Sequence, residues 1–135
     1  MHQLSGKELK TLKERIESLL KSIDVVVFED YDKGVLTKEV IKYTIKRTNE
    51  LGIPSVVDPK KKNFYHYTGA SLFKPNLKEI QDGMKIDLDR EDLSGLKSAV
   101  SNLKEKMKLK SVMVTLSEKG ILISADQSEI HIPAH

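Results

Sequence analysis

An asparagine and a glutamate at positions 76 and 79, within the segment SLFKPNLKEI, form the pattern in this chain that most directly suggests chemistry. At the start of a helix, Asn76 can act as the N-cap while Glu79 reaches back to close a capping box. The same helical turn presents free N–H groups that favour an anion such as phosphate. A carboxylate beside phosphate can hold Mg²⁺, directly or through its water shell. A helix cap and a magnesium-phosphate site are both compatible with this pair.

Three other polar segments follow apolar runs, and each has a chemical and a structural interpretation. FEDYDKG, which contains Asp30, could be a metal-binding loop, a substrate-binding loop or simply the polar end of a strand. In VVDPKKK, Asp58 and Lys60 could face a phosphate, or Asp58-Pro59 could simply end a strand. In VTLSEKG, Thr115 and Gly120 are equally typical of an ordinary turn. The four histidines are scattered without metal-ligand spacing, and we assign them no metal.

The apolar periodicity predicts which elements position these residues. Helices are expected from the Ser5 cap to about Ser22, from Thr37 to Gly52, from Asn76 to about Asp82, and from Asp89 or Asp92 to Met107. Strands are expected at 23–30, 53–59, 70–75, 110–116, 121–125 and 129–134. The first strand, IDVVVFED, has the continuous β-branched pattern of a strand buried on both faces. Residues 60–69 are polar and irregular, with one short helical turn at most.

This order of elements predicts an α/β fold. Strands separated by helices require right-handed crossovers, so the first four strands should form a mostly parallel sheet with helices on both faces, followed by an antiparallel β-meander. Residues 1–135 are expected to form a single domain. Ligands of such sheets bind beyond the carboxyl ends of the strands. The polar residues named above all fall at that rim.

Composition narrows the class of protein. The chain has 39% hydrophobic and 32% charged residues, no cysteine, and no apolar run that approaches the roughly 20 residues needed to cross a bilayer. Net charge is +3, and only three of the 23 basic residues are arginine, which argues against nucleic-acid recognition. We expect no nucleic-acid or membrane partner and, in the absence of an export signal, a cytoplasmic location.

A receiver-type signalling module is the main alternative at this length. It would use acidic residues after an early strand, a central aspartate, a later threonine and a Lys-Pro pair. Asp30, Asp58, Thr115 and Lys74-Pro75 supply the pieces, but Lys-Pro precedes the threonine and the chain ends in strands rather than a helix. A non-catalytic, receiver-like binding module therefore remains the second hypothesis.

Four segments in this order resemble a known family. VVVFEDYDKGVLT, IPSVVDPKKKNFYHYTGASLFKPNLKEI, VMVTLSEKG and IHIPAH are similar to the middle of PfkB (ribokinase-like) carbohydrate kinases. Within that family they most resemble the kinase part of bacterial ADP-heptose synthases, which phosphorylates heptose 7-phosphate at its C1 hydroxyl for lipopolysaccharide core synthesis. The resemblance implies an ATP- and Mg²⁺-dependent kinase of the ribokinase-like fold.

The resemblance also implies roles for individual residues. Asn76 and Glu79 match the family's N-x-x-E, which organises Mg²⁺ and the nucleotide phosphates. Thr115 and Gly120 match a turn that lines the nucleotide site, and Asp58 with Lys60 match the DPK of the phosphate-facing rim. The loop residues Asp30, Tyr31 and Lys33 match a segment near the sugar phosphate.

The resemblance further implies that the general base and anion hole belong to a Gly-Ala-Gly-Asp segment, and no Gly-x-Gly-Asp occurs in these 135 residues. The chain is therefore expected to be an internal fragment of a kinase and inactive in isolation. Loss of flanking strands would leave a sheet edge unpaired, so we also expect a homo-oligomer.

Overall fold

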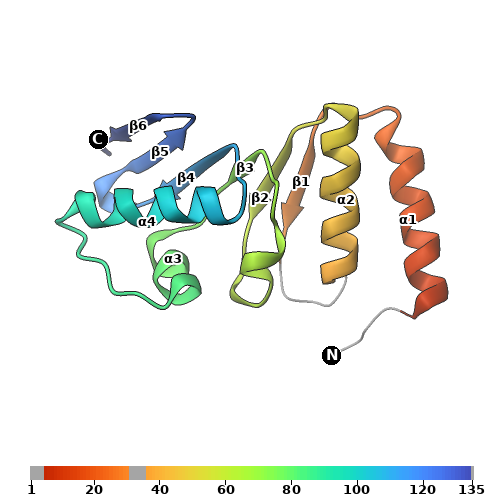
Figure 1. The fold of residues 1–135 in the computed structure, drawn as a ribbon, viewed down its shortest axis with the longest axis horizontal. Helices are drawn as coiled ribbons and strands as arrows, with labels where there is room; N and C mark the ends of the chain where they lie inside the picture. Colours follow the sequence, from red (N-terminus) through yellow and green to blue (C-terminus); the bar gives the residue numbers. More distant parts are fainter. Residues whose placement is uncertain (1–4, 31–35, 135) are drawn as a thin grey trace.

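The computed structural model describes residues 5–30 and 36–134, which form one six-stranded sheet with the strands in chain order (Figure 1). The strands are β1 (Val26–Glu29), β2 (Ser55–Asp58), β3 (Leu72–Phe73), β4 (Ser111–Thr115), β5 (Ile121–Ala125) and β6 (Ser128–Ile132). Strands β1 to β4 are parallel, and β5 and β6 continue the sheet in antiparallel pairing. The α/β class, the mostly parallel sheet and the final meander are therefore confirmed.

Within residues 5–30 and 36–134, the structure has four α-helices and two short 3₁₀ helices, of which α1 precedes β1 and the others lie between strands. They are α1 (Gly6–Leu20), α2 (Lys38–Leu51), η1 (Lys61–His66), α3 (Leu77–Met84), α4 (Leu93–Lys106) and η2 (Ser117–Lys119). The helix starts follow the predicted caps, because Ser5 and Thr37 each accept a hydrogen bond from a backbone N–H in the first turn of α1 and α2. Gly52 ends α2 in the left-handed conformation with φ +70°. None of the helices in the described ranges is long and apolar enough to cross a membrane.

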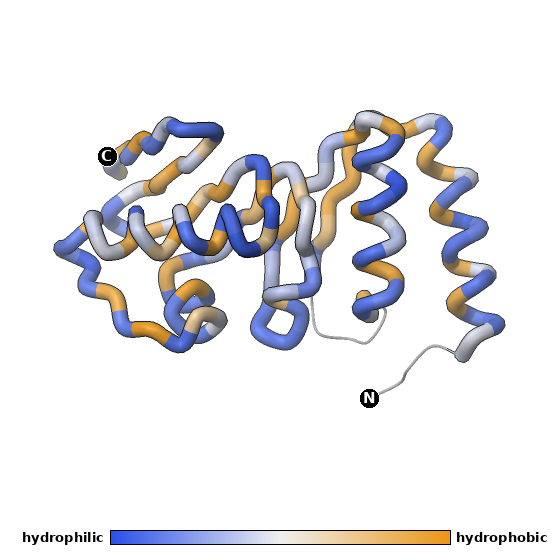
Figure 2. The backbone as a smooth tube through the Cα atoms, in the orientation of Figure 1, coloured by the Kyte–Doolittle hydropathy of each residue, from blue (hydrophilic) through white to orange (hydrophobic). Residues whose placement is uncertain are grey.

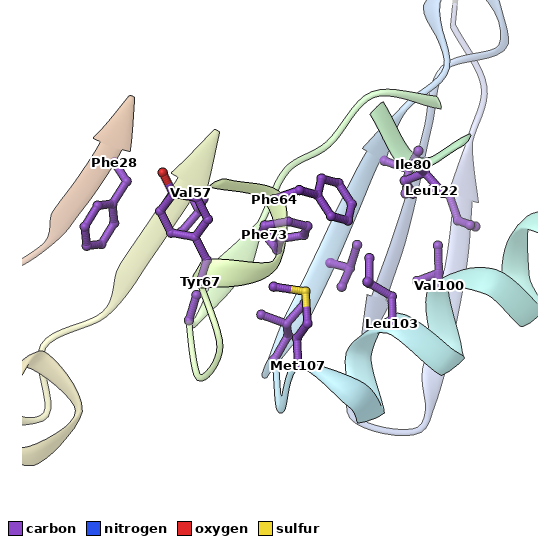
Figure 3. Close-up of a cluster of buried hydrophobic side chains, with 14 of the residues drawn as sticks. Phe28, Val57, Phe64, Tyr67, Phe73, Ile80, Val100, Leu103, Met107 and Leu122 are labelled. Carbon is purple, nitrogen blue, oxygen red and sulfur yellow. The ribbon is translucent and has the colours of Figure 1, made fainter. Parts of the chain in front are cut away.

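The hydrophobic core lies against one face of the sheet. Because the strand order runs continuously from β1 to β4, each right-handed crossover carries its connecting segment over the same face. Helices α2, α3 and α4 and the η1 turn bury their apolar residues in one cluster with that face (Figure 3). Its sheet residues are Phe28, Val57, Phe73, Val112, Val114 and Leu122. Three aromatic rings bridge its centre, since Tyr67 lies between Phe28 and Phe73 with ring centroids 5.5 and 6.3 Å away.

The opposite face of the sheet is apolar but partly exposed. Register places Val27, Met113, Ile123 and Ile130 on this face, where Val27 is 55% exposed. The prediction that the first strand is buried on both faces is therefore wrong. In the described residues β1 is an edge strand, and the crossover helices lie over one face of the sheet only, not over both faces as the sequence predicted. Figure 2 shows that the backbone of β1, at the edge of the sheet, is made up mainly of hydrophobic residues.

Helix α1 packs against α2 through charged and aromatic side chains. The Glu17 carboxylate accepts hydrogen bonds from Arg47 Nε at 2.6 Å and Nη2 at 3.1 Å, and from the Tyr43 hydroxyl. These bonds, with that from Arg47 making the largest contribution, lower the pKa of Glu17 from 4.5 to about 2. Lys13 Nζ lies 5.1 Å from the centroid of the Tyr43 ring on the same surface. Polar contacts between side chains therefore attach α1 to α2.

Replacing Glu17 with glutamine is expected to reduce stability slightly at neutral pH and not at all in strong acid. A lowered folded-state pKa contributes stability above the unfolded value, and that contribution is lost as pH falls through about 2. The effect is small because the pair is partly exposed to solvent. Urea unfolding from pH 2 to pH 7 measures the difference, with Glu14→Gln on the exposed side of α1 as the control. A pH-independent difference between wild type and Glu17→Gln would contradict this expectation.

Candidate functional site

The carboxyl ends of the four parallel strands meet at one rim of the sheet. The backbone N–H of Asp30 donates to the carbonyl of Asp58 at 3.4 Å, joining the ends of β1 and β2. On the other side of the rim, Asn76 and Thr115 form an isolated parallel bridge, and the Thr115 N–H donates to the Pro75 carbonyl at 3.2 Å. Asp58, Asn76 and Thr115 are therefore at the same end of the sheet, as the topology predicted.

Asn76 and Glu79 form a complete capping box. The Glu79 N–H donates to Asn76 Oδ1 at 2.7 Å, and the Asn76 N–H donates to Glu79 Oε1 at 2.8 Å. The structural interpretation of this pair is therefore confirmed. The capping box uses only one carboxylate oxygen of Glu79, Oε1. The second oxygen, Oε2, is available for other contacts at the rim.

The second oxygen of Glu79 faces a lysine from the neighbouring strand end. Lys60 Nζ lies 3.5 Å from Glu79 Oε2, a long contact between a carboxylate that is 17% exposed and an ammonium group that is more open to solvent. Asp58 and Thr115 are both exposed at the same rim. Glu79 and Lys60 thus bring one carboxylate and one ammonium group together at this rim, a pair that can accompany Mg²⁺ and phosphate because Mg²⁺ prefers oxygen ligands and a lysine attracts phosphate. In the described ranges, no group of three or more His, Cys, Asp or Glu residues is placed to hold a metal.

The presence of glycine at position 120 is explained by packing, in addition to the nucleotide-binding role predicted from the sequence. Its φ is +92°, and a Cβ at this position would lie 1.9 Å from the Ile132 carbonyl oxygen. The carbonyl of Gly120 also accepts from the Leu116 N–H at 2.8 Å, which closes the turn after β4. Glycine is therefore required here by the close approach of the C-terminal segment, independently of any nucleotide.

Asp30 faces protein side chains in the interior. It is 2% exposed, and its Oδ2 accepts hydrogen bonds from Asn63 Nδ2 at 2.9 Å and from the Tyr67 hydroxyl at 2.8 Å. The other two predicted sugar-side residues, Tyr31 and Lys33, lie outside the described residues. Asn63 and Tyr67 come from a segment that the sequence presents as irregular. The only local signal for their burial is the aromatic pair Phe64 and Tyr67.

Comparison with known proteins identifies the family. Residues 2–135 match the pfkB family of carbohydrate kinases. The chain is 41% identical over 118 residues to the "Bifunctional protein HldE" of Sulfurimonas denitrificans, covering 85% of this chain and 24% of that protein. It is 39% identical over 126 residues to the same-named protein of Nitratiruptor sp., covering 90% of this chain and 26% of that protein. The chain thus spans about a quarter of the length of these relatives.

Solved structures share the fold. Phosphofructokinase-2 from Escherichia coli, in complex with fructose-6-phosphate, aligns with TM-score 0.75 at 22% identity, covering 97% of this chain and 43% of that one. Arabidopsis thaliana ribokinase complexed with ribose and ATP aligns with TM-score 0.66 at 15% identity, covering 98% of this chain and 39% of that one. The family match over nearly the whole chain decides against the receiver-like alternative. This chain belongs to the pfkB family of carbohydrate kinases.

Proposed function

We propose that this chain is the central part of an ATP-dependent kinase that transfers a phosphoryl group to the C1 hydroxyl of heptose 7-phosphate. The observation that carries the proposal is the meeting of Asp58, Asn76 and Thr115 at one rim of a pfkB-family sheet. The choice of sugar is supported by the identity of 37% or more to curated proteins named HldE. Because the chain covers about a quarter of those relatives, the proposed activity is that of the whole protein.

In this proposal the rim binds the nucleotide. Glu79 and Asn76 would hold Mg²⁺, Lys60 and Asp58 would face the phosphates, and Thr115 and Gly120 would line the nucleotide. Mg²⁺ would neutralise phosphate charge during transfer. The capping box fixes the Glu79 carboxylate against the start of α3, so the oxygen near Lys60 is held at the rim without further ordering.

Asp30, Tyr31 and Lys33 belong to the sugar-phosphate side in this proposal. The general base and the anion hole would come from segments outside these 135 residues, because no Gly-x-Gly-Asp occurs in the sequence. The isolated chain should therefore show no kinase turnover. A cytoplasmic location is part of the proposal, since ATP is the phosphoryl donor of that compartment.

The test compares the complete protein with the 135-residue chain in a coupled assay of ATP consumption. The complete protein should consume ATP with heptose 7-phosphate and far more slowly with fructose 6-phosphate or ribose, while the chain alone should stay at background. Consumption with only an unrelated acceptor would refute the substrate assignment. Heptose-dependent turnover by the isolated chain would refute the assignment of base and anion hole to other segments.

We further propose that the chain associates with copies of itself through the exposed β1 edge. Val27 on this edge is 55% exposed, and an unpaired strand invites another strand. The E. coli relative also has a structure described as a tetrameric inhibited form. Light scattering should show a dimer or larger for wild type and a monomer for Val27→Lys. Leu51→Lys at the exposed end of α2 is the control, and a monomeric wild type at high concentration would overturn the proposal.

A further inference from the structure

Two ion pairs join the turn after β4 to the connection between α3 and α4. We define the η2 turn as residues 116–119, which lead from the end of β4 to Gly120. Arg90 Nη1 donates to Glu118 Oε1 at 3.0 Å, and Lys119 Nζ donates to Glu91 Oε2 at 3.1 Å. Each segment therefore contributes one cation and one anion to a contact across 28 positions of sequence.

A histidine on β6 contacts the backbone of the same turn. His131 Nε2 lies 2.7 Å from the Lys119 carbonyl oxygen. A carbonyl oxygen only accepts hydrogen bonds, so the His131 ring must donate from Nε2. The C-terminal segment thus holds the turn through this side chain as well as through the close approach of the Ile132 carbonyl to Gly120.

The η2 turn has a backbone conformation that needs support from its surroundings. Ser117 has a φ of +52°, in the left-handed region that residues with a side chain adopt uncommonly. Inside the turn, the Lys119 N–H donates to the Leu116 carbonyl and the Gly120 N–H to the Ser117 carbonyl, both at 3.0 Å. A strained residue in so short a turn persists when neighbouring elements hold it in place.

The partner residues in the α3–α4 connection are themselves fixed. Asp89 Oδ1 accepts the Glu91 N–H at 2.9 Å, and Asp92 Oδ1 accepts the Ser94 N–H at 3.1 Å as the N-cap of α4. Helix α4 is packed in the core. Arg90 and Glu91 therefore extend toward the η2 turn from a short segment that is attached to the start of a core helix.

We propose that Arg90, Glu91 and His131 are positioning residues that hold the η2 turn in place and thereby set the affinity for MgATP. This inference rests on the proposed function, which assigns Thr115 and Gly120, the residues on either side of the turn, to the nucleotide. A turn that is held before binding loses less conformational freedom when the nucleotide arrives, which favours binding. The three positioning residues themselves act through the turn and not on the nucleotide.

The first test reverses one ion pair in the complete protein and measures MgATP binding by isothermal titration. Arg90→Glu and Glu118→Arg should each weaken binding about three- to fivefold, because like charges then face each other. The double variant restores opposite charges and should bind within about 1.5-fold of wild type. Arg15→Glu, on the exposed side of α1, makes the same change of charge away from the turn and should have no effect.

The double variant also separates positioning from direct contact with the nucleotide. If Arg90 bound the phosphates itself, exchanging its charge with that of Glu118 would not recover the affinity. A double variant that binds as weakly as Arg90→Glu would therefore overturn the inference.

The second test concerns the hydrogen bond from β6 and uses steady-state kinetics of the complete protein. His131→Leu should raise the KM for MgATP about three- to tenfold, while kcat and the KM for the acceptor change less than about twofold. His131→Gln should recover most of the affinity, because its amide nitrogen can donate to the Lys119 carbonyl. Equal losses in kcat and both KM values in His131→Leu, or a glutamine variant as weak as the leucine variant, would overturn the inference.

Hydrogen exchange of the complete protein measures the turn directly. In His131→Leu and in Arg90→Glu, the amides of Lys119 and Gly120 should exchange at least about fivefold faster than in wild type, while that of Val57 in β2 stays unchanged. Unchanged exchange at Lys119 and Gly120 would overturn the inference. If wild type binds no MgATP, the proposed function fails and this inference fails with it, whereas equal MgATP binding by wild type and all variants refutes this inference alone.

Discussion

Replacement of Gly120 with alanine is expected to lower the free energy of unfolding by about 3 kcal/mol, from backbone strain plus overpacking. The new Cβ would lie 1.9 Å from the Ile132 carbonyl oxygen and 2.8 Å from both the Ala134 nitrogen and the Pro133 carbonyl carbon. These are backbone atoms, so no side-chain rotation can relieve the contact. The φ of +92° adds strain for any residue with a side chain. Urea unfolding measures the loss.

Gly95 provides a matched control for that substitution. A Cβ there would meet Leu88 Cδ2 at 3.8 Å, an ordinary van der Waals contact, and the position lies within α4. Gly95→Ala should therefore raise stability by up to about 1 kcal/mol through helix propensity. If Gly120→Ala were as stable as wild type, the approach of the C-terminal segment to the turn after β4 would not be as the structure has it.

Under the proposed function, substitution of Glu79 with glutamine is expected to reduce MgATP affinity or activity of the complete kinase about 10- to 100-fold, the range typical of losing a group that supports a bound metal. Glutamine can replace glutamate in a capping box, so the hydrogen bond to the Asn76 N–H and the start of α3 should persist. Only the charge near Lys60 is removed. Isothermal titration with MgATP and steady-state kinetics measure the effect.

The chain contains a second capping box that serves as the control. Glu8 accepts from the Ser5 N–H at 3.1 Å at the start of α1, as Glu79 does from Asn76 at the start of α3. Glu8→Gln makes the same chemical change at the start of α1, which packs on α2 and lies at the far side of the molecule from α3, and it should leave MgATP affinity unchanged. If the two substitutions had equal effects on MgATP affinity, or if Glu79→Gln had none, Asn76 and Glu79 would have only a structural role as a helix cap.

Much of the fold could be predicted because its signals are local. The capping boxes at Ser5 and Asn76 and the left-handed end of α2 at Gly52 each depend on residues a few positions apart. The prediction that Asp58 and Thr115 lie at the same rim of the sheet follows from the right-handed crossovers between parallel strands. This rule holds whatever the contacts of individual side chains are.

The features that could not be predicted depend on long-range contacts. An apolar run such as VVVF at β1 looks the same in a central strand and in an edge strand, and only the sheet order reveals that Val27 is exposed. Similarly, Asn63 and Tyr67 contact Asp30 across 33 and 37 positions in the sequence. The aromatic residues Phe64 and Tyr67 are the one local sign that side chains of this polar turn enter the interior, and they do not reveal the contact with Asp30.

Chemical-shift mapping of the ¹⁵N-labelled chain during titration with MgATP tests the nucleotide rim most directly. We expect the amides of Asp58, Asn76, Glu79 and Thr115 to shift together, with smaller changes in Glu79→Gln and none in the β5–β6 turn at the other end of the meander. Shifts confined to that turn, or no shift at millimolar MgATP in either the chain or the complete protein, would contradict a nucleotide site at the ends of the parallel strands.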